Sequence, residues 1–394
     1  MEHPPVLFQL FALLLAAKIG DELFKRIGQP ALVGEILGGL VVGPAVLGWY
    51  EVTVETELFA QIGAVLLLFE VGVHTRVGDI VRVGSTALAA AVLGVIVPFV
   101  GGFLLGGAFG LETDGRLFLA ASLTATSVAV SSRVLNSLRA LTSIAGRTIL
   151  AAAVIDDVLG LLVVGVVTGL AAGAIDLPHI ALVLLLAVAF IVIVLAAGTG
   201  ILRRQRSLLT VPRFAETPFL PGMIIMLGLA ALAAQIGLAA IIGAFLAGTV
   251  VGESAEQEAL EVETAPVAAF FTPFFFGFIG AQIDPSAFAS WHAVLLVSAL
   301  LAVAVATKFV GVFLGALGGG WRRAVVIGWG MVPRGEVEIV IAGLALASGA
   351  FGHETYAIVI AMVVLTMVLA PPALGPLIRW AGAGDQAAIP ATVL

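Results

Sequence analysis

The 394-residue sequence lacks cysteine altogether, has only two tyrosines, and carries little charge: Asp, Glu, Lys and Arg make up 11%. The absence of cysteine excludes disulfides, thiol catalysis and thiolate metal sites. Soluble domains carry about 25% charged residues, and here 61% of residues are hydrophobic instead. This composition excludes a soluble enzyme, and the net charge of −7 also argues against a nucleic-acid binder.

Long apolar runs fill most of the chain. A membrane-spanning segment needs about 20 mostly apolar residues, and it must be helical because hydrocarbon leaves no backbone group unpaired without cost. We therefore predict an all-α polytopic membrane protein with 13 transmembrane helices: 6–27, 30–48, 57–75, 84–109, 115–137, 146–173, 178–202, 219–235, 237–252, 265–282, 288–315, 322–347 and 354–382. Because only twelve residues follow Gly382, we expect no soluble regulatory domain.

The basic residues predict the orientation. Cytoplasmic loops are enriched in Lys and Arg, and only Arg116 follows an even-numbered helix. Thirteen basic residues follow odd-numbered helices: Lys25, Arg26, Arg76, Arg82, Arg139, Arg147, Arg203, Arg204, Arg206, Arg213, Arg322, Arg323 and Arg379. We expect a multi-pass protein of the inner (cytoplasmic) membrane with its N-terminus outside and its C-terminus in the cytoplasm.

The sequence also repeats itself at an offset of 209 residues. The segments 27–43 (IGQPALVGEILGGLVVG) and 236–252 (IGLAAIIGAFLAGTVVG) agree at Ile27, Gly28, Ala31, Gly34, Leu37, Gly39, Val41, Val42 and Gly43. These segments are the second and ninth predicted helices, which cross the membrane in opposite directions. An inverted-topology repeat of helices 2–6 and 9–13 is typical of transporters, whose binding site lies near the midplane.

A few charges fall inside the apolar runs. A charge at the bilayer centre costs about 2.5–3.5 kcal/mol on insertion scales, so each one is a functional candidate. Asp156 and Asp157 lie near the middle of helix 6, and Lys308 lies within helix 11. Neighbouring helical residues point about 100° apart. One aspartate is therefore expected to pair with Lys308 while the other faces a cavity.

Helices 5 and 12 are predicted to be broken. The segment 330–340 (GMVPRGEVEIV) contains Pro333, which removes a backbone donor and clashes with the preceding turn. The hydroxyl-rich segment 123–132 (LTATSVAVSS) is its counterpart in helix 5. Irregular backbone at this depth must be buried by protein or line a wet cavity. We interpret Arg334 and Glu336 mainly as compensating the partial charges of the broken helix ends.

The remaining buried carboxylates are less easily assigned. Glu70 lies deep in helix 3, and we interpret it either as a buried ion-pair partner or as a cavity-lining group. We assign no role to Glu35 or Glu338 from the sequence. The five histidines lie near helix ends or in loops, and their spacing predicts no structural metal site.

Five features in one order resemble a known family: GAVLLLFEVGVHTR, ATSVAVSSRVL, AAAVIDDVLGL, the membrane lysine Lys308, and GMVPRGEV. Together they are similar to the NapA-type sodium/proton antiporters, within the bacterial monovalent cation:proton antiporter group that also includes KefC. The resemblance runs from QPALVGEILGGLVVGP to the last helix.

The resemblance implies an NhaA/NapA-like antiporter fold with crossed broken helices. Helices 4–6 and 11–13 (about 84–173 and 288–382) would form an ion-translocating core that moves like an elevator. Helices 1–3 and 8–10 (about 6–75 and 219–282) would form the dimerisation part of a homodimer, and helix 7 (about 178–202) would be a linker.

The resemblance also implies roles for single residues. Asp157 would bind Na⁺, Li⁺ or H⁺, and Asp156 would pair with Lys308 when no sodium is bound. Thr126 and Ser127 would lie near the ion, and two adjacent aspartates imply electrogenic exchange without a cofactor. Glu70 departs from the NapA-like pattern, which has an apolar residue there, so it is a candidate cavity carboxylate that alters ion preference.

Other functions keep part of this pattern. K⁺/H⁺ exchange would use the same fold and the same aspartate pair, and sodium-coupled uptake of an organic anion would use a related fold. An intramembrane aspartyl protease also needs two aspartates, but on different helices so that they can share a water. No enzymatic activity is therefore expected.

Overall fold

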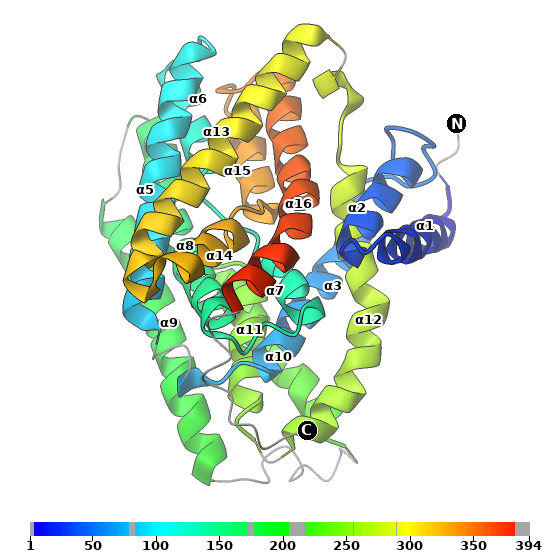
Figure 1. Ribbon diagram of the computed structural model, residues 1–394, viewed down its shortest axis with the longest axis vertical. Helices are drawn as coiled ribbons and strands as arrows, with labels where there is room; N and C mark the ends of the chain where they lie inside the picture. The colour runs from blue at the N-terminus through cyan, green and yellow to red at the C-terminus, as the bar shows by residue number, and fades with distance from the viewer. Residues whose placement is uncertain are drawn as a thin grey trace.

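The computed structural model describes residues 4–78, 83–171, 173, 177–204, 217–254, 256–288 and 290–382. Every regular element among them is a helix, as predicted (Figure 1). The residues after Gly382 and the basic residues Arg82, Arg206 and Arg213, which supported the predicted orientation, lie outside this part of the chain.

Two groups of helices flank a connecting helix, α9 (Leu177–Arg204). The first group comprises α1 (Val6–Arg26), α2 (Ala31–Val42), α3 (Val54–Val73), α5 (Gly84–Ala108), α6 (Thr113–Ser122), α7 (Val128–Ser137) and α8 (Ile144–Ala171). The second comprises α10 (Phe219–Gln235), α11 (Ala240–Val251), α12 (Gln257–Ala281), α13 (Trp291–Ala316), α14 (Trp321–Gly330), α15 (Glu336–Ala347) and α16 (His353–Gly382). Short 3-10 turns occupy Pro285–Phe288 and Leu317–Gly319.

The 209-residue offset extends over nearly the whole fold. Adding 209 to the bounds of α2 gives the bounds of α11, and adding it to the last residue of α1 gives the last residue of α10. The pairs α5 and α13, α6 and α14, α7 and α15, and α8 and α16 match within two residues at both ends. The repeat therefore also includes α1 and α10, the first helix of each half, which the sequence identities did not indicate.

Seven described helices are long and apolar enough to cross a membrane, judged by length and composition alone. They are α3, α5, α8, α9, α12, α13 and α16, while α2, α10 and α11 are shorter apolar helices. The chain is thus a multi-pass membrane protein, and the number of 13 crossings stays a prediction.

The largest differences between predicted and observed helix boundaries occur at two places. The run predicted at 30–48 ends as a helix at Val42, because Gly43 and Pro44 follow and proline cannot continue a helix. The run predicted at 265–282 begins earlier, at Gln257. The first turns of α12 carry several glutamates, and hydropathy alone does not reveal a polar helical extension beyond the membrane.

Glycines let the helices approach closely. A Cβ on Gly39 of α2 would lie 1.9 Å from the carbonyl oxygen of Gly277 in α12, and one on Gly248 of α11 would lie 2.1 Å from that of Phe69 in α3. Gly311 and Gly315 do the same for α13 against α5. Small residues at such contacts are the usual means of packing helices in membranes, where no hydrophobic force acts between them.

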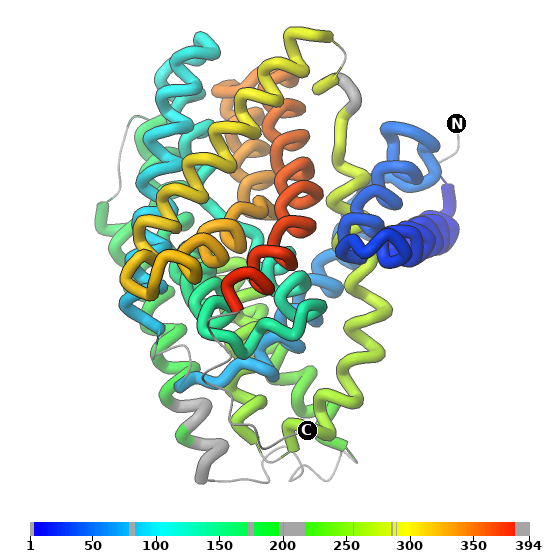
Figure 2. Tube along the Cα trace, viewed as in Figure 1, coloured from blue at the N-terminus to red at the C-terminus, as the bar shows by residue number. Residues whose placement is uncertain are grey.

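The helices gather in two regions of the molecule. In Figure 1 α5, α6, α13, α14, α15 and α16 occupy one side, and α13 packs along α5 and against α14 and α16. In Figure 2 the blue α1 and α2 lie on the opposite side from the orange and red segments, with α12 against α2 and α3. The helix α7 contacts both α8 and α3 and so lies where the two regions meet.

Candidate functional site

Two interrupted helices contact each other at the centre of the molecule. Helix α6 ends at Ser122 and α7 begins at Val128, and α14 ends at Gly330 and α15 begins at Glu336, so the predicted breaks are confirmed. The intervening segments are joined directly, since the backbone N–H of Ser127 donates to the carbonyl of Pro333 at 2.8 Å. Proline explains the second break, because no N–H is available there to continue α14.

Hydroxyl groups of the first break and of α7 satisfy backbone carbonyls in the second break and at the end of α14. The hydroxyl of Thr126 donates to the carbonyl of Met331 at 3.1 Å, and that of Ser131 donates to the carbonyl of Gly330 at 2.6 Å. The last carbonyls of a helix have no partner within the helix, so these contacts stabilise the end of α14 without water. Thr126 also lies beside Asp156.

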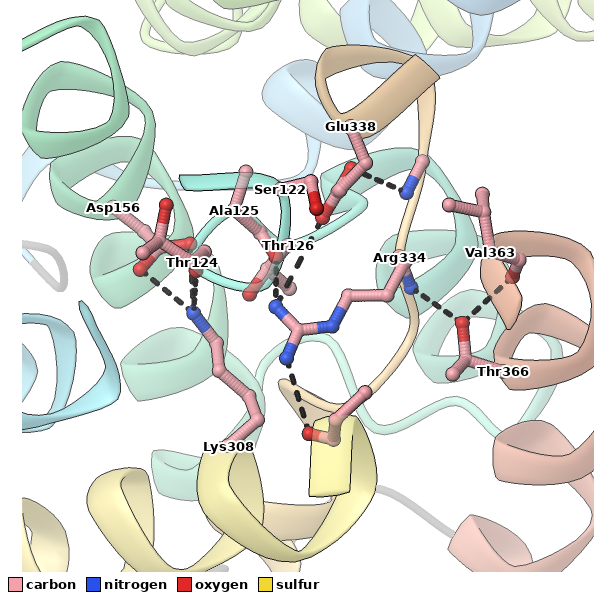
Figure 3. A network of polar contacts seen from close by, with 12 residues as sticks. Ser122, Thr124, Ala125, Thr126, Asp156, Lys308, Arg334, Glu338, Val363 and Thr366 are labelled. Carbon is pink, nitrogen blue, oxygen red and sulfur yellow. Dashed lines mark hydrogen bonds and ion pairs between the residues drawn. The ribbon is translucent and has the colours of Figure 1, made fainter. Parts of the chain in front are cut away.

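Close contact of the two segments requires a glycine at position 335. A Cβ there would lie 2.7 Å from the Cβ of Ser127. Real Cβ atoms do not approach that closely, so any larger residue would push the breaks apart. Figure 3 shows the two segments running past each other, with the charged side chains of α8, α13 and the second break pointing into the crossing.

Lys308 reaches this crossing from α13 and neutralises one of the two aspartates. Its ammonium donates to Oδ1 and Oδ2 of Asp156 at 2.9 and 3.0 Å, and also to the carbonyl of Thr124 in the first break (Figure 3). Both charged side chains are fully buried. Gly94 lets α5 pack closely on α13 beside the lysine, because a Cβ there would lie 2.7 Å from Cγ2 of Val312. All three ammonium donors are thus satisfied.

Asp157 is left without such compensation. It follows Asp156 on α8 and is 6% exposed, and its Oδ2 has no hydrogen-bond partner among the described residues. Its charged neighbours include Asp156, Glu336, Glu338 and Lys308, three of them acidic. This buried carboxylate oxygen is therefore available to take up a proton or to ligate a cation.

Arg334 contacts two backbone carbonyls and one carboxylate. Its guanidinium donates to the carbonyl of Ala125 in the first break and, at 3.1 Å, to the carbonyl of Ala304 in α13. Its nearest carboxylate is Glu338, one turn further along, at 3.9 Å. Cations at the carboxyl end of a helix interact favourably with the helix dipole, so Lys308 and Arg334 both stabilise α6.

Glu338 caps the helix that follows the second break. Its Oε2 accepts a hydrogen bond from the N–H of Gly335 at 2.7 Å, as in a capping box. The sequence reading left this residue unassigned, although a carboxylate three residues after a break is a usual capping pattern. Glu336, by contrast, faces a cavity between α15 and α3, α10, α11 and α12.

Glu35 and Glu70 belong to a second group of charges. Glu35 of α2 is fully buried, 3.7 Å from Lys18 of α1 and 3.8 Å from Arg133 of α7. Glu70 of α3 is half-buried, with Arg133 and His74 among its charged neighbours. These carboxylates therefore meet at Arg133, where α7 contacts α2 and α3. Among the described residues no group of three or more His, Asp or Glu is placed to hold a metal ion.

Comparison with known proteins supports a single family. The family described as "Sodium/hydrogen exchanger, transmembrane" matches residues 10–380. The chain belongs to this sodium/hydrogen exchanger family. The match covers both repeats and every site residue described above, and it places the protein among transporters rather than enzymes.

Individual members of the sodium/hydrogen exchanger family are similar over nearly their whole length. The Na⁺/H⁺-K⁺ antiporter GerN of Bacillus cereus is 34% identical over 370 residues, which cover 93% of this chain and 95% of GerN. The high-affinity Na⁺/H⁺ antiporter NhaS3 of Synechocystis is 32% identical, covering 93% of this chain and 88% of NhaS3. The structure of the sodium proton antiporter MjNhaP1 from Methanocaldococcus jannaschii matches with a TM-score of 0.73 and 16% identity over 97% of this chain, which supports the fold.

The inverted repeat gives this sodium/hydrogen exchanger one further site residue. Thr366 of α16 lies 209 positions after Asp157, and its hydroxyl accepts from the N–H of Arg334 at 3.1 Å while donating to Val363. At equivalent positions of the two halves, Asp157 thus has an oxygen without a partner, whereas the hydroxyl of Thr366 binds the backbone of the second break. The offset was available in the sequence and could have identified Thr366.

Proposed function

We propose that this chain is a secondary antiporter that exchanges Na⁺ or Li⁺ for H⁺ across the cytoplasmic membrane, with Asp157 as the shared site. The observation that carries the proposal is the unpartnered Oδ2 of Asp157, buried beside two broken helices. Membership of the sodium/hydrogen exchanger family and the names of the relatives agree with it. Transported cations and protons are then the ligands, and no cofactor takes part.

Competition for one carboxylate couples the two fluxes. Protonation removes the charge that attracts a cation, and a bound cation excludes the proton. Oxygen ligands suit hard monovalent cations, and the hydroxyls of Thr126 and Ser127 lie at the same crossing. Because the cation and the proton occupy the same site in turn, transport requires only that the loaded site move between the two membrane faces.

Asp156 and Lys308 would add a second proton to the exchange. A cation held by both aspartates replaces the ammonium of Lys308 at Asp156, which the lysine contacts at 2.9 and 3.0 Å. When the released lysine also gives up its proton, one cation replaces two protons. The exchange is then electrogenic.

Movement of the site would divide the helices into two other groups, each of which takes members from both halves of the chain. The core would comprise α5–α8 and α13–α16, and α1–α3 with α10–α12 would form the stationary part, which pairs with a second copy in a homodimer. The helix α9 would link them. Tight glycine contacts lie within each group, as between α13 and α5 or α11 and α3, which favours an elevator-type movement of the core as one body. The N-terminus would lie outside.

Reconstituted proteoliposomes with an imposed pH gradient test the function. We expect Na⁺ and Li⁺ to dissipate the gradient saturably, and Asp157→Asn to abolish this without changing folding. The control is Asp114→Asn, an exposed carboxylate in the first turn of α6, which should leave exchange intact. Exchange that persists in Asp157→Asn would overturn the site. Exchange that does not respond to an imposed membrane potential would overturn electrogenicity.

K⁺/H⁺ exchange is the second candidate, because the relative GerN is named for K⁺ as well as Na⁺. Repeating the assay with K⁺ decides between them. Comparing the unsubstituted protein with Glu70→Leu in the same assay tests whether that carboxylate alters ion preference. An unchanged ratio of Na⁺-driven to K⁺-driven exchange would assign Glu70 a structural role.

A further inference from the structure

A cavity of about 530 Å³ separates α15 from α3, α10, α11 and α12. Its lining is almost wholly apolar, and its polar side chains are Glu57, Gln61, Gln282 and Glu336. Glu57 and Gln61 lie in the early turns of α3, are exposed, and are joined by a hydrogen bond of 3.1 Å. The polar groups of α3 therefore mark the open end of the cavity.

Glu336 differs from the other polar residues of this cavity. It is the first residue of α15, directly after the second break, and it is only partly exposed. Its Oε2 has no hydrogen-bond partner among the described residues. Arg334 is occupied by two backbone carbonyls and lies nearest to Glu338, so the described ion pairs do not neutralise Glu336.

Glu336 also lies close to the ion-binding aspartate. It is one of the charged groups that act on Asp157, together with Asp156 and Glu338. Asp156 is held by Lys308 and Glu338 caps the break. Glu336 is thus a carboxylate that belongs both to the surroundings of Asp157 and to the wall of the cavity.

A charge in this position acts strongly on small ions. Apolar walls have a low dielectric constant, so they focus the field of a single buried charge along the cavity and raise the local concentration of counter-ions. An exposed charge such as Glu57 is screened by water and salt over about 10 Å at 0.1 M. Of the two carboxylates that line the cavity, Glu336 is therefore the one that attracts cations to its buried end.

We propose that Glu336 is a cation-attracting carboxylate at the buried end of this cavity, where a monovalent cation binds in passing before it reaches Asp157. The inference rests on the proposed antiport function and assigns one of its two access routes. Under the expected orientation the cavity opens to the outside, because α3 begins and α12 ends beside it.

The test is a side-specific KM. Cation-driven exchange is measured in proteoliposomes of known orientation, with Na⁺ added from the cavity side or from the opposite side. We expect Glu336→Gln to raise the KM for Na⁺ from the cavity side about tenfold, to leave the KM from the opposite side unchanged, and to change kcat less than twofold. Added choline chloride should shrink the difference from the unsubstituted protein. Glu57→Gln is the matched control and should change neither KM.

The absence of cysteine permits a second measurement on one folded variant. Glu336→Cys is treated from the cavity side with a sulfonatoethyl or a trimethylammonioethyl methanethiosulfonate. We expect the negative group to lower the KM of the Cys variant and the positive group to raise it. Reagents of both signs having the same effect would overturn the proposal.

Other outcomes separate this proposal from the proposed function. Equal changes of KM from both sides, or loss of kcat with unchanged KM, would mean that Glu336 stabilises the broken helix and would refute the entry role. A Glu336→Gln protein that does not fold would likewise indicate a structural role if the Cys variant is also insensitive to the sign of the reagent. Absence of exchange in the unsubstituted protein would instead refute the antiport function itself.

Discussion

Neutralising one partner of the Asp156–Lys308 pair should destabilise the protein far more than neutralising both. The ammonium and the carboxylate are fully buried, and in Asp156→Asn the lysine would keep its charge with only amide and carbonyl groups to contact. Removing one partner of a buried pair costs about 3–5 kcal/mol, whereas replacing both is often nearly neutral. At an unfolding entropy of about 2.1 cal/mol/K per residue, this corresponds to a fall in melting temperature of roughly 4–6 °C.

The assay is thermal unfolding in detergent of Asp156→Asn, Lys308→Gln and a double variant, Asp156→Leu with Lys308→Met, that replaces the pair by apolar residues of similar volume. We expect each single variant to melt about 4–6 °C lower, and the double variant to lie within about 2 °C of the parent. The control is Arg26→Gln, which breaks a pair with Glu22 at 2.9 Å whose side chains are 72% and 61% exposed. Such surface pairs contribute about 0.2–1 kcal/mol, or roughly 1 °C. A double variant that melts as low as the sum of the singles would refute the argument.

Three further predictions concern the crossing. Gly335→Ala should lower the melting temperature by an amount equivalent to about 1–3 kcal/mol and reduce exchange, because its Cβ would lie 2.7 Å from that of Ser127; normal melting and exchange would contradict this. Thr366→Val should lower the free energy of unfolding by about 1–3 kcal/mol, because it leaves the backbone N–H of Arg334 unpaired. Thr366→Ser should keep that hydrogen bond and the stability, and unfolding measurements on both variants test this. Because one cation is proposed to replace two protons, one at Asp157 and one at Lys308, each unit by which pH falls below the pKa values of both groups should raise the KM for Na⁺ about a hundredfold at constant kcat, and a KM independent of pH would exclude competition.

The elements follow from local sequence to a large extent. Apolar runs of sufficient length predicted the helices, and Pro333 predicted the second break, because a missing backbone donor acts at its own position in the chain. The inverted repeat was visible in the segments 27–43 and 236–252. Its extension to the first helix of each half was not, because the residues on those helices differ and only their last positions correspond at the offset of 209.

Contacts between distant residues did not follow in the same way. Arg334 and Glu336 were interpreted together because they are neighbours in sequence, yet Arg334 contacts carbonyls 209 and 30 residues away. Glu338 caps the break, and Glu336 faces a cavity formed by four other helices. Which side of a helix meets which neighbour depends on the rotation and tilt of packed helices, and local composition does not encode these.

The sequence by itself determined that this is a helical membrane protein with a repeated, twice-broken architecture and with charges that the bilayer tolerates only for a purpose. These properties depend on hydrophobicity and backbone chemistry, which act locally. Residue chemistry left open which aspartate pairs with Lys308, the family resemblance implied Asp156, and the tertiary structure shows that Lys308 holds Asp156 while Asp157 keeps an oxygen without a partner. Two adjacent carboxylates are chemically alike, and only the direction from which α13 and the crossed breaks approach α8 makes them different.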